Sequence, residues 1–217
     1  MEITTKQIQQ VETYLDKKSF DFIDLKVEVL DHMISDIESF LDNNYSFENA
    51  FKLTVLKWDQ HFKDTSSFYF GLQYHESKIV VKKAIKMFRP FFFLYLSSYI
   101  LPVLFLKNFS IVFSKNTIYL VNEFLNLITA VFLIYLIFIF IKVIKSKVKT
   151  TYRFVLRTQY LGMIFLVIPL LMGSHFNDKG NLEPVFTGFL CGGFAVTYIC
   201  HYFFKKHKEA INIYRIS

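Results

Sequence analysis

The chain is poor in cysteine and lacks the common catalytic motifs. Its 217 residues include two cysteines, four prolines and one tryptophan. Cys191 and Cys200 lie in one apolar run, where helical geometry separates them by about 13 Å, too far for a disulfide bond. No P-loop, GxSxG, HExxH or CxxC motif occurs. The usual ATPase, hydrolase and metalloprotease classes are therefore not expected, no cofactor is indicated, and the sequence favours a protein that is not an enzyme.

Charge is also scarce, and it is unevenly distributed. Charged residues make up 20% of the chain against 53% hydrophobic residues, which excludes a disordered chain. Residues 1–64 hold 7 Lys and Arg against 13 Asp and Glu, a net charge of −6. Residues 65–89 carry +4 and residues 90–217 carry +9. Because the basic residues accompany the apolar part, the expected partners are anionic lipid head groups and no nucleic acid.

Four apolar runs are long enough to span a bilayer as helices. They cover residues 91–106, 120–143, 154–172 and 185–204. The connection between the second and third runs and the tail after the fourth are rich in Lys and Arg, whereas the other two connections carry three lysines in total. By the positive-inside rule, we expect a multi-pass protein of the bacterial inner membrane with both termini in the cytoplasm.

The residues before the first run show helical periodicity. We expect helices over residues 4–17 and 21–41 and a third ending near Phe62, followed by a basic amphipathic helix over 79–87. The apolar stripe expected on the second helix is Ile23, Val27, Leu30, Ile34, Ile37 and Leu41, widened by Phe22, Val29, Met33 and Phe40.

The predicted fold class is all-α: a polytopic membrane protein with an N-terminal cytoplasmic helical module and a four-helix transmembrane bundle. The module covers residues 1–76, a basic connecting helix covers 77–89, the transmembrane domain covers 90–204, and a basic cytoplasmic tail covers 205–217. A helical module this small has a marginal core alone, so we expect it to dock on the membrane part or on a partner.

Two groups of polar residues on the second helix are candidate sites. An acidic flank beside the apolar stripe is a candidate partner-binding surface, formed by Asp24, Asp31, Glu38 and Asp42. Glu28, His32 and Asp36 lie four residues apart and share a helix face, where they could bind Zn²⁺ or a similar ion. A closed zinc site needs a fourth ligand, and no fourth residue has suitable spacing, so a solvated face with local pairing is the competing interpretation.

The membrane part offers two further candidates. Glu123 is an acidic residue at the outer end of the second run, either hydrated at the interface or part of a proton or ion path. Gly188 and Gly192 form a GxxxG pattern that lets another backbone approach closely. That approach can come from within the chain's own bundle, from a second copy or from a partner.

One segment of the module resembles a known family. The sequence EVLDHMISDIES over Glu28–Ser39, followed by YSFENAF, is similar to the HAAS or permease-prefix module of small bacterial membrane proteins associated with PadR-type regulators. The similarity covers roughly residues 8–60. It implies a cytoplasmic signalling or regulatory prefix ahead of transmembrane helices and brings no catalytic residues.

These patterns predict a non-catalytic inner-membrane adaptor, regulatory subunit or accessory subunit that acts through its acidic module. Its expected partner is a membrane or cytoplasmic protein, or a second copy of the chain. The alternative is a small transporter or channel that uses Glu123 in the four-helix bundle.

Overall fold

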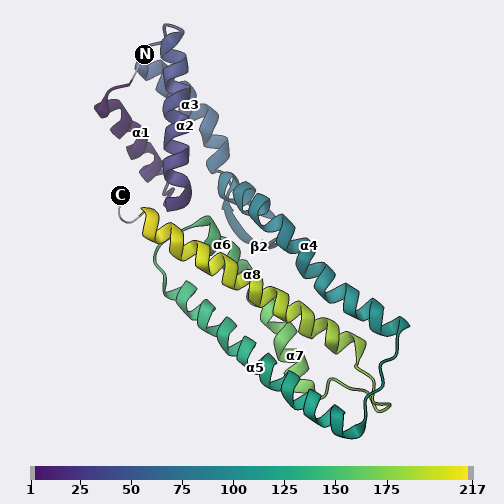
Figure 1. Ribbon diagram of the computed structural model, residues 1–217. Helices are drawn as coiled ribbons and strands as arrows, with labels where there is room; N and C mark the ends of the chain where they lie inside the picture. Colours follow the sequence, from purple (N-terminus) through teal and green to yellow (C-terminus); the bar gives the residue numbers. More distant parts are fainter. Residues whose placement is uncertain (1–2, 215–217) are drawn as a thin grey trace. The chain divides into compact units, whose positions relative to one another are not determined.

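The computed structural model describes residues 3–214, and helices dominate it (Figure 1). The helices are α1 (Thr5–Lys17), α2 (Ile23–Asp42), α3 (Phe47–Phe62), α4 (Lys78–Asn108), α5 (Lys115–Lys145), α6 (Thr151–Thr158), α7 (Ile164–Met172) and α8 (Pro184–Tyr214), with a 3₁₀ turn, η1, at Tyr160–Met163. Two short strands, β1 (Asp64–Ser67) and β2 (Gly71–Ser77), form an antiparallel hairpin. The predicted all-α class is confirmed.

Contacts divide the chain into two compact units. The first, called the N-terminal unit, contains the chain up to Lys86, the segment Lys147–Phe154 and the chain from Lys206 onward. The second, called the membrane unit, contains Met87–Ser146 and Val155–Lys205. The sequence did not indicate that residues 147–154 and the end of α8 belong with the N-terminal helices.

The core of the N-terminal unit forms where α1 and α3 contact α2. Gln7 stabilises the start of α1, because its side-chain oxygen accepts a hydrogen bond from the backbone N–H of Thr4 at 2.8 Å, the pattern of a capping box. Apolar residues recurring at helical spacing are buried here, among them Val11, Leu15, Val29, Met33, Ile37, Ala50 and Trp58.

The buried face of α2 agrees in part with the predicted stripe. Val29, Met33 and Ile37 belong to that stripe and are buried, and Leu25, which the stripe did not include, is buried with them. Val27 was expected in the core but is 59% exposed. The core is therefore centred on one edge of the predicted stripe, because the positions that α1 and α3 cover decide which part of a broad apolar face is buried.

The hairpin was not foreseen in the mixed composition of residues 63–76. Ser67 pairs with Gly71 across a short loop, and the N–H of Phe70 donates to the carbonyl of Ser67 at 3.1 Å. Gly71 has φ +91°, a conformation that favours glycine and is typical of three-residue hairpin loops. Directly after β2 the chain begins α4 at Lys78.

The segment Lys147–Phe154 joins the N-terminal unit at the start of α2. The N–H of Ile23 donates to the carbonyl of Lys149 at 3.2 Å, and the Lys149 ammonium lies 3.4 Å from the Asp21 carboxylate. Further along the chain, the Thr150 hydroxyl lies 2.8 Å from Nδ1 of His207 on α8. These contacts tie three regions distant in sequence into one unit.

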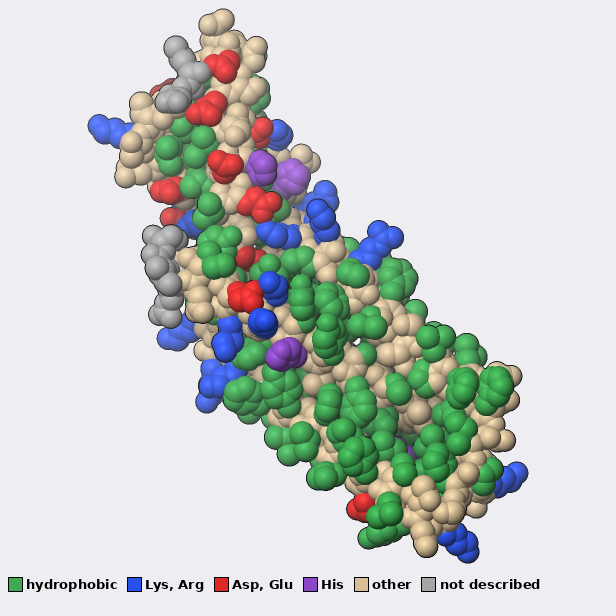
Figure 2. All heavy atoms as spheres, viewed as in Figure 1, with side chains coloured by type: hydrophobic (Ala, Val, Ile, Leu, Met, Phe, Trp, Pro, Cys, Tyr) green, Lys and Arg blue, Asp and Glu red, His purple; other side chains and the backbone are tan. Residues whose placement is uncertain are grey.

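The membrane unit holds the candidate spans. Three helices, α4, α5 and α8, are each long and apolar enough to cross a membrane. A fourth crossing results if α6 and the following η1 and α7 are counted as one span, with a bend of 45° between α6 and η1. The four predicted apolar runs fall in these elements. Figure 2 shows hydrophobic side chains covering the surface of this unit, as expected for a surface in contact with lipid.

Three details of the membrane helices differ from the prediction. The basic connecting helix and the first span form one continuous helix, α4, with Pro90 and Pro102 inside it. The expected tail continues α8 as far as Tyr214. The third apolar run, predicted as one helix, is interrupted at Gln159 between α6 and η1.

The two connections of the membrane unit that carry few charges pair with each other. The N–H of Phe113 donates to the carbonyl of Gly180 at 3.0 Å, and Val112 forms an isolated antiparallel bridge with Asn181. Gly180 has φ +79°. The loop between α4 and α5 and the loop between α7 and α8 therefore meet at one end of the unit.

Candidate functional site

Three carboxylates of α2 share one face of the helix: Asp31, Glu38 and Asp42, here called the acidic ridge. Spacings of seven and four residues return to nearly the same angle around an α-helix, because one turn takes 3.6 residues. Asp31 and Asp42 are exposed, and Glu38 is partly exposed. Figure 2 shows acidic side chains gathered over the helices of the N-terminal unit. Asp31 and Glu38 of this ridge are thus accessible to a partner.

Asp24 was expected on the same flank, and the expectation that it stays in water is wrong. It is 7% exposed, and its carboxylate accepts hydrogen bonds from the backbone N–H of Thr151 at 2.9 and 3.2 Å. Thr151 opens α6, so Asp24 satisfies a free N–H at the start of that helix. The physical reason is a contact between residues 127 positions apart, which helical periodicity cannot reveal.

The proposed metal ligands are engaged elsewhere. Glu28 accepts a hydrogen bond from Lys83 at 2.7 Å. Asp36 binds Lys57 at 2.8 Å through each oxygen and accepts from the Trp58 indole at 2.8 Å. Within residues 3–214 no group of three His, Cys, Asp or Glu side chains could hold a metal ion. Glu28, His32 and Asp36 therefore do not form the ligand set that their spacing suggested.

Both paired carboxylates have lowered pKa values. The hydrogen bond from Lys83 is the main cause that lowers the pKa of Glu28. Burial acts to raise the pKa of Asp36, but hydrogen bonds from Lys57 and Trp58 outweigh it and hold the pKa below its usual value. The folded unit therefore favours the ionised form of each group.

Acidification is expected to destabilise the N-terminal unit through Asp36. Because its pKa is lower in the folded unit than in the unfolded chain, its contribution is complete above the unfolded-state value and disappears as the pH falls through the folded-state value. Asp36→Asn should therefore flatten the loss of stability below about pH 4. Trp58 fluorescence in denaturant titrations measures this. Ser35→Ala, which changes no charge at an exposed position of the same helix, is the control. A loss of stability on acidification that is as steep in Asp36→Asn as in the wild-type protein contradicts the prediction.

A polar network closes the end of the membrane unit where the two loops meet. Asn122 and Asn126 on α5 both donate to the carbonyl of Gly173, at 2.8 and 3.1 Å. His175 is fully buried. Its backbone N–H donates a hydrogen bond to Asn122 Oδ1 at 2.9 Å, and its ring atom Nε2 lies 3.1 Å from Asn126 Oδ1. This network was not predicted from the sequence. Two asparagines four residues apart at the end of an apolar run lie on one helix face and could have indicated a polar contact there. The evident role of the network is to hold the loop after α7.

Glu123 lies beside this network but is exposed. The two asparagines use their side chains to bind Gly173 and His175. The structure therefore does not bring Glu123 together with other polar groups of the bundle in an ion path.

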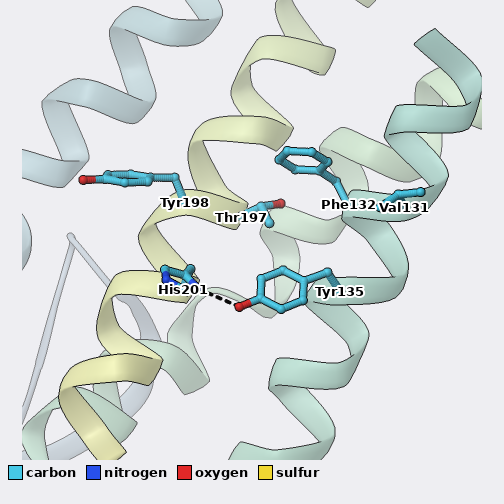
Figure 3. Close-up of a pocket in the computed structure, with 6 residues that line it drawn as sticks. All are labelled: Val131, Phe132, Tyr135, Thr197, Tyr198 and His201. Carbon is cyan, nitrogen blue, oxygen red and sulfur yellow. Dashed lines mark hydrogen bonds between the residues drawn. The ribbon is translucent and has the colours of Figure 1, made fainter. Parts of the chain in front are cut away.

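A cavity of about 270 Å³ lies between α5 and α8 (Figure 3). Tyr135 and His201 point toward one another across it, with the phenol oxygen 2.6 Å from Nδ1 of the imidazole. The other lining residues are Val131, Phe132, Thr197 and Tyr198. The Thr197 hydroxyl donates to the carbonyl of Gly193 at 2.9 Å. The cavity thus presents apolar walls and one polar pair that satisfies itself, which suits packing against lipid chains and provides no arrangement of nucleophile, acid and base.

The GxxxG glycines of α8 face other helices of the same unit. A Cβ atom on Gly188 would lie 2.5 Å from Val103 Cγ2 and 3.0 Å from the carbonyl oxygen of Tyr99, both on α4. A Cβ on Gly192 would lie 3.2 Å from a ring carbon of Phe165 on α7. Both glycines therefore serve close packing within the chain's own bundle.

Comparisons with known proteins add no relative. No family model, no curated protein and no solved structure matches this chain.

Proposed function

We propose that this protein is a non-catalytic membrane adaptor, regulatory subunit or accessory subunit whose acidic ridge binds a basic surface of a protein partner. The observation that supports this proposal is how the carboxylates of α2 are paired, and Asp31 and Glu38 differ here from their neighbours. Within the described residues neither takes part in an ion pair, whereas Glu28 and Asp36 on the same helix each have a lysine partner. A solvent-facing row of one charge favours association with a surface of opposite charge.

The chain segments that form the N-terminal unit support a topology in which this unit, with its acidic ridge, lies on one side of the membrane. This unit contains the chain before α4's apolar part, the connection between α5 and α6, and the end of α8. For one compact unit to contain all three, the chain must return to the same side after α4 and α5, and again after α7 and α8. The paired loops at Phe113 and Gly180 support the same pattern. Four crossings satisfy both conditions.

The distribution of basic residues supports a cytoplasmic location for that side. Lys145, Lys147 and Lys149 lie in the connection between α5 and α6, and Lys205, Lys206 and Lys208 follow the last apolar run. In inner-membrane proteins such connections remain in the cytoplasm. There they also attract anionic lipid head groups. We therefore place both termini and the acidic ridge in the bacterial cytoplasm.

The alternative of a small transporter or channel has less support. It depended on Glu123, which is exposed, and the asparagines beside it already bind the loop after α7. The described residues therefore favour the adaptor.

Photo-crosslinking in native membranes tests the proposed partner surface. Benzoylphenylalanine replaces Ser35, which is exposed on α2 between Asp31 and Glu38. We expect one discrete adduct with a protein partner, and we expect the combined Asp31→Lys and Glu38→Lys variant to lose it, because reversed charge repels a basic surface.

Two controls make the crosslinking decisive. The charge-preserving variant with Asp31→Glu and Glu38→Asp should retain the adduct, and the same probe at the exposed Gln9 on α1 should not form it. An adduct that survives charge reversal, or none with any protein, contradicts the proposed binding through the ridge. An adduct between two copies of the chain would identify the partner as a second copy.

A further inference from the structure

The turn of the β1–β2 hairpin carries two apolar side chains into solvent. Phe68 is 85% exposed and Leu72 is 71% exposed. Phe68 occupies an inner position of the turn closed by the hydrogen bond from Phe70 to Ser67. Such positions usually hold Gly, Asn, Asp, Ser or Pro. Two exposed apolar side chains on one turn form a small apolar surface, and covering such a surface with an apolar environment is favourable.

The residues around the tip resemble those of a membrane interface. Between Asp64 and Glu76 the sequence TSSFYFGLQYH contains no Lys, Arg, Asp or Glu and has four aromatic residues. Tyrosine and other aromatic side chains are typical of the layer between lipid chains and head groups. An uncharged aromatic hairpin suits this layer better than the charged rim of a protein interface.

The base and the tip of the hairpin are each joined to a segment that leads into the membrane unit; at the base this is α4, whose residues up to Lys86 belong to the N-terminal unit. β2 ends at Ser77, and the next residue begins α4, whose apolar part is a candidate span. At the tip, Phe70 is buried and packs edge-to-face on Phe154, with ring centroids 5.3 Å apart. Phe154 is directly followed by Val155, the first residue of the next membrane-unit segment. The tip is therefore held where a span begins.

The segment that holds the hairpin is basic. Lys147, Lys149 and Arg153 lie within seven residues of Phe154. Cations at the start of a span attract the phosphates of lipid head groups. An apolar tip that contacts this basic segment through Phe70 and Phe154 has the composition of an interfacial membrane anchor.

We infer that the hairpin tip, Phe68 to Leu72, inserts into the bilayer on the side where the N-terminal unit lies. Phe68 and Leu72 enter the layer between head groups and acyl chains, and Phe70 joins the tip to the start of the third span through Phe154. The hairpin thus forms a lipid contact of the N-terminal unit in addition to the spans themselves. This inference is independent of which partner the acidic ridge binds.

Fluorescence quenching by brominated lipids tests the inference on the full chain in lipid nanodiscs that contain phosphatidylglycerol. Phe68→Trp and Leu72→Trp are prepared separately, and the signal of the native Trp58 is subtracted by using the wild-type protein. We expect the added tryptophan in each variant to emit at shorter wavelength and to lose most of its emission to bromolipids, because interfacial residues lie within reach of brominated chains.

Leu56→Trp is the matched control, because Leu56 is a 63% exposed apolar residue of α3 in the same unit. Its emission should respond to the water-soluble quencher acrylamide and not to bromolipids. Tip tryptophans that behave like the control place the hairpin in water and overturn the inference. Tip emission at short wavelength without bromolipid quenching indicates a protein cover and overturns it equally. Leu72→Trp keeps the test informative if Phe68→Trp disturbs the turn.

Discussion

Asp24→Ala is expected to lower the free energy of unfolding of the N-terminal unit by about 1–3 kcal/mol. The substitution removes the acceptor for the Thr151 N–H at the start of α6. It leaves that donor without a partner in a buried place, since Thr151 is fully buried. It also weakens the junction between α2 and a segment over a hundred residues later. Urea titration of the full chain in detergent, followed by Trp58 fluorescence, measures the change.

The control for this prediction is Asp31→Ala. Asp31 lies seven residues later on the same helix but is exposed, so its removal should change the stability by less than about 0.5 kcal/mol. Asp24→Asn keeps an acceptor oxygen and should fall between wild type and Asp24→Ala. If Asp24→Ala and Asp31→Ala unfold at the same urea concentration, the contact between α2 and α6 does not stabilise the unit.

Gly188→Ala is expected to destabilise the membrane unit by about 1–3 kcal/mol, the usual cost of overpacking. The new Cβ would lie 2.5 Å from Val103 and 3.0 Å from the backbone oxygen of Tyr99. A side chain can turn aside, but a backbone carbonyl cannot, so α8 and α4 must separate. Heating in detergent with a thiol-reactive dye reports unfolding in a Cys191→Ala background, because the remaining Cys200 is fully buried and reacts only after it is exposed.

Gly192→Ala provides the matched comparison one turn later on α8. Its Cβ would meet only ring carbons of Phe165 at 3.2 and 3.6 Å and a Cβ of Tyr99 at 3.7 Å. The Phe165 ring can move by a few tenths of an ångström, so the transition temperature should fall less than in Gly188→Ala. Equal behaviour of the two variants would show that the close approach of α4 at Gly188 does not limit packing.

Much of the secondary structure could be predicted because it follows from local patterns. The four apolar runs lie in α4, α5, α6–α7 and α8, since the length and composition of a span are local properties. The limits of α1 and α3 follow from the capping pattern at Thr4 and from the turn before Ser46. In contrast, β1 and β2 are short and mostly polar, so neither alternation nor length distinguished them from a loop.

The site could be predicted only where exposure depends on the helix alone. Asp31 and Asp42 are exposed because no other element covers that face of α2. Asp24 shares the same angular position but is covered by the segment Lys147–Phe154. Likewise, the regular spacing of Glu28, His32 and Asp36 suggested a metal site, but Lys83 and Lys57 arrive from α4 and α3. Partners that come from distant elements decide the outcome in each case, and a single sequence contains no direct sign of them.

The proposed topology has four crossings that hold the N-terminal unit on one side of a membrane. Cysteine labelling in intact cells with a membrane-impermeant maleimide tests this topology after Cys191 and Cys200 are replaced by alanine. Single cysteines are placed at four exposed positions: Ser39, Lys147, Ser110 and Asp178.

With four crossings, Ser110→Cys and Asp178→Cys are expected to react in intact cells, whereas Ser39→Cys and Lys147→Cys are expected to react only after the membrane is opened. Labelling of Asp178→Cys on the same side as Ser39→Cys would contradict the four crossings. It would show that the bent pair of α6 and α7 does not cross the membrane.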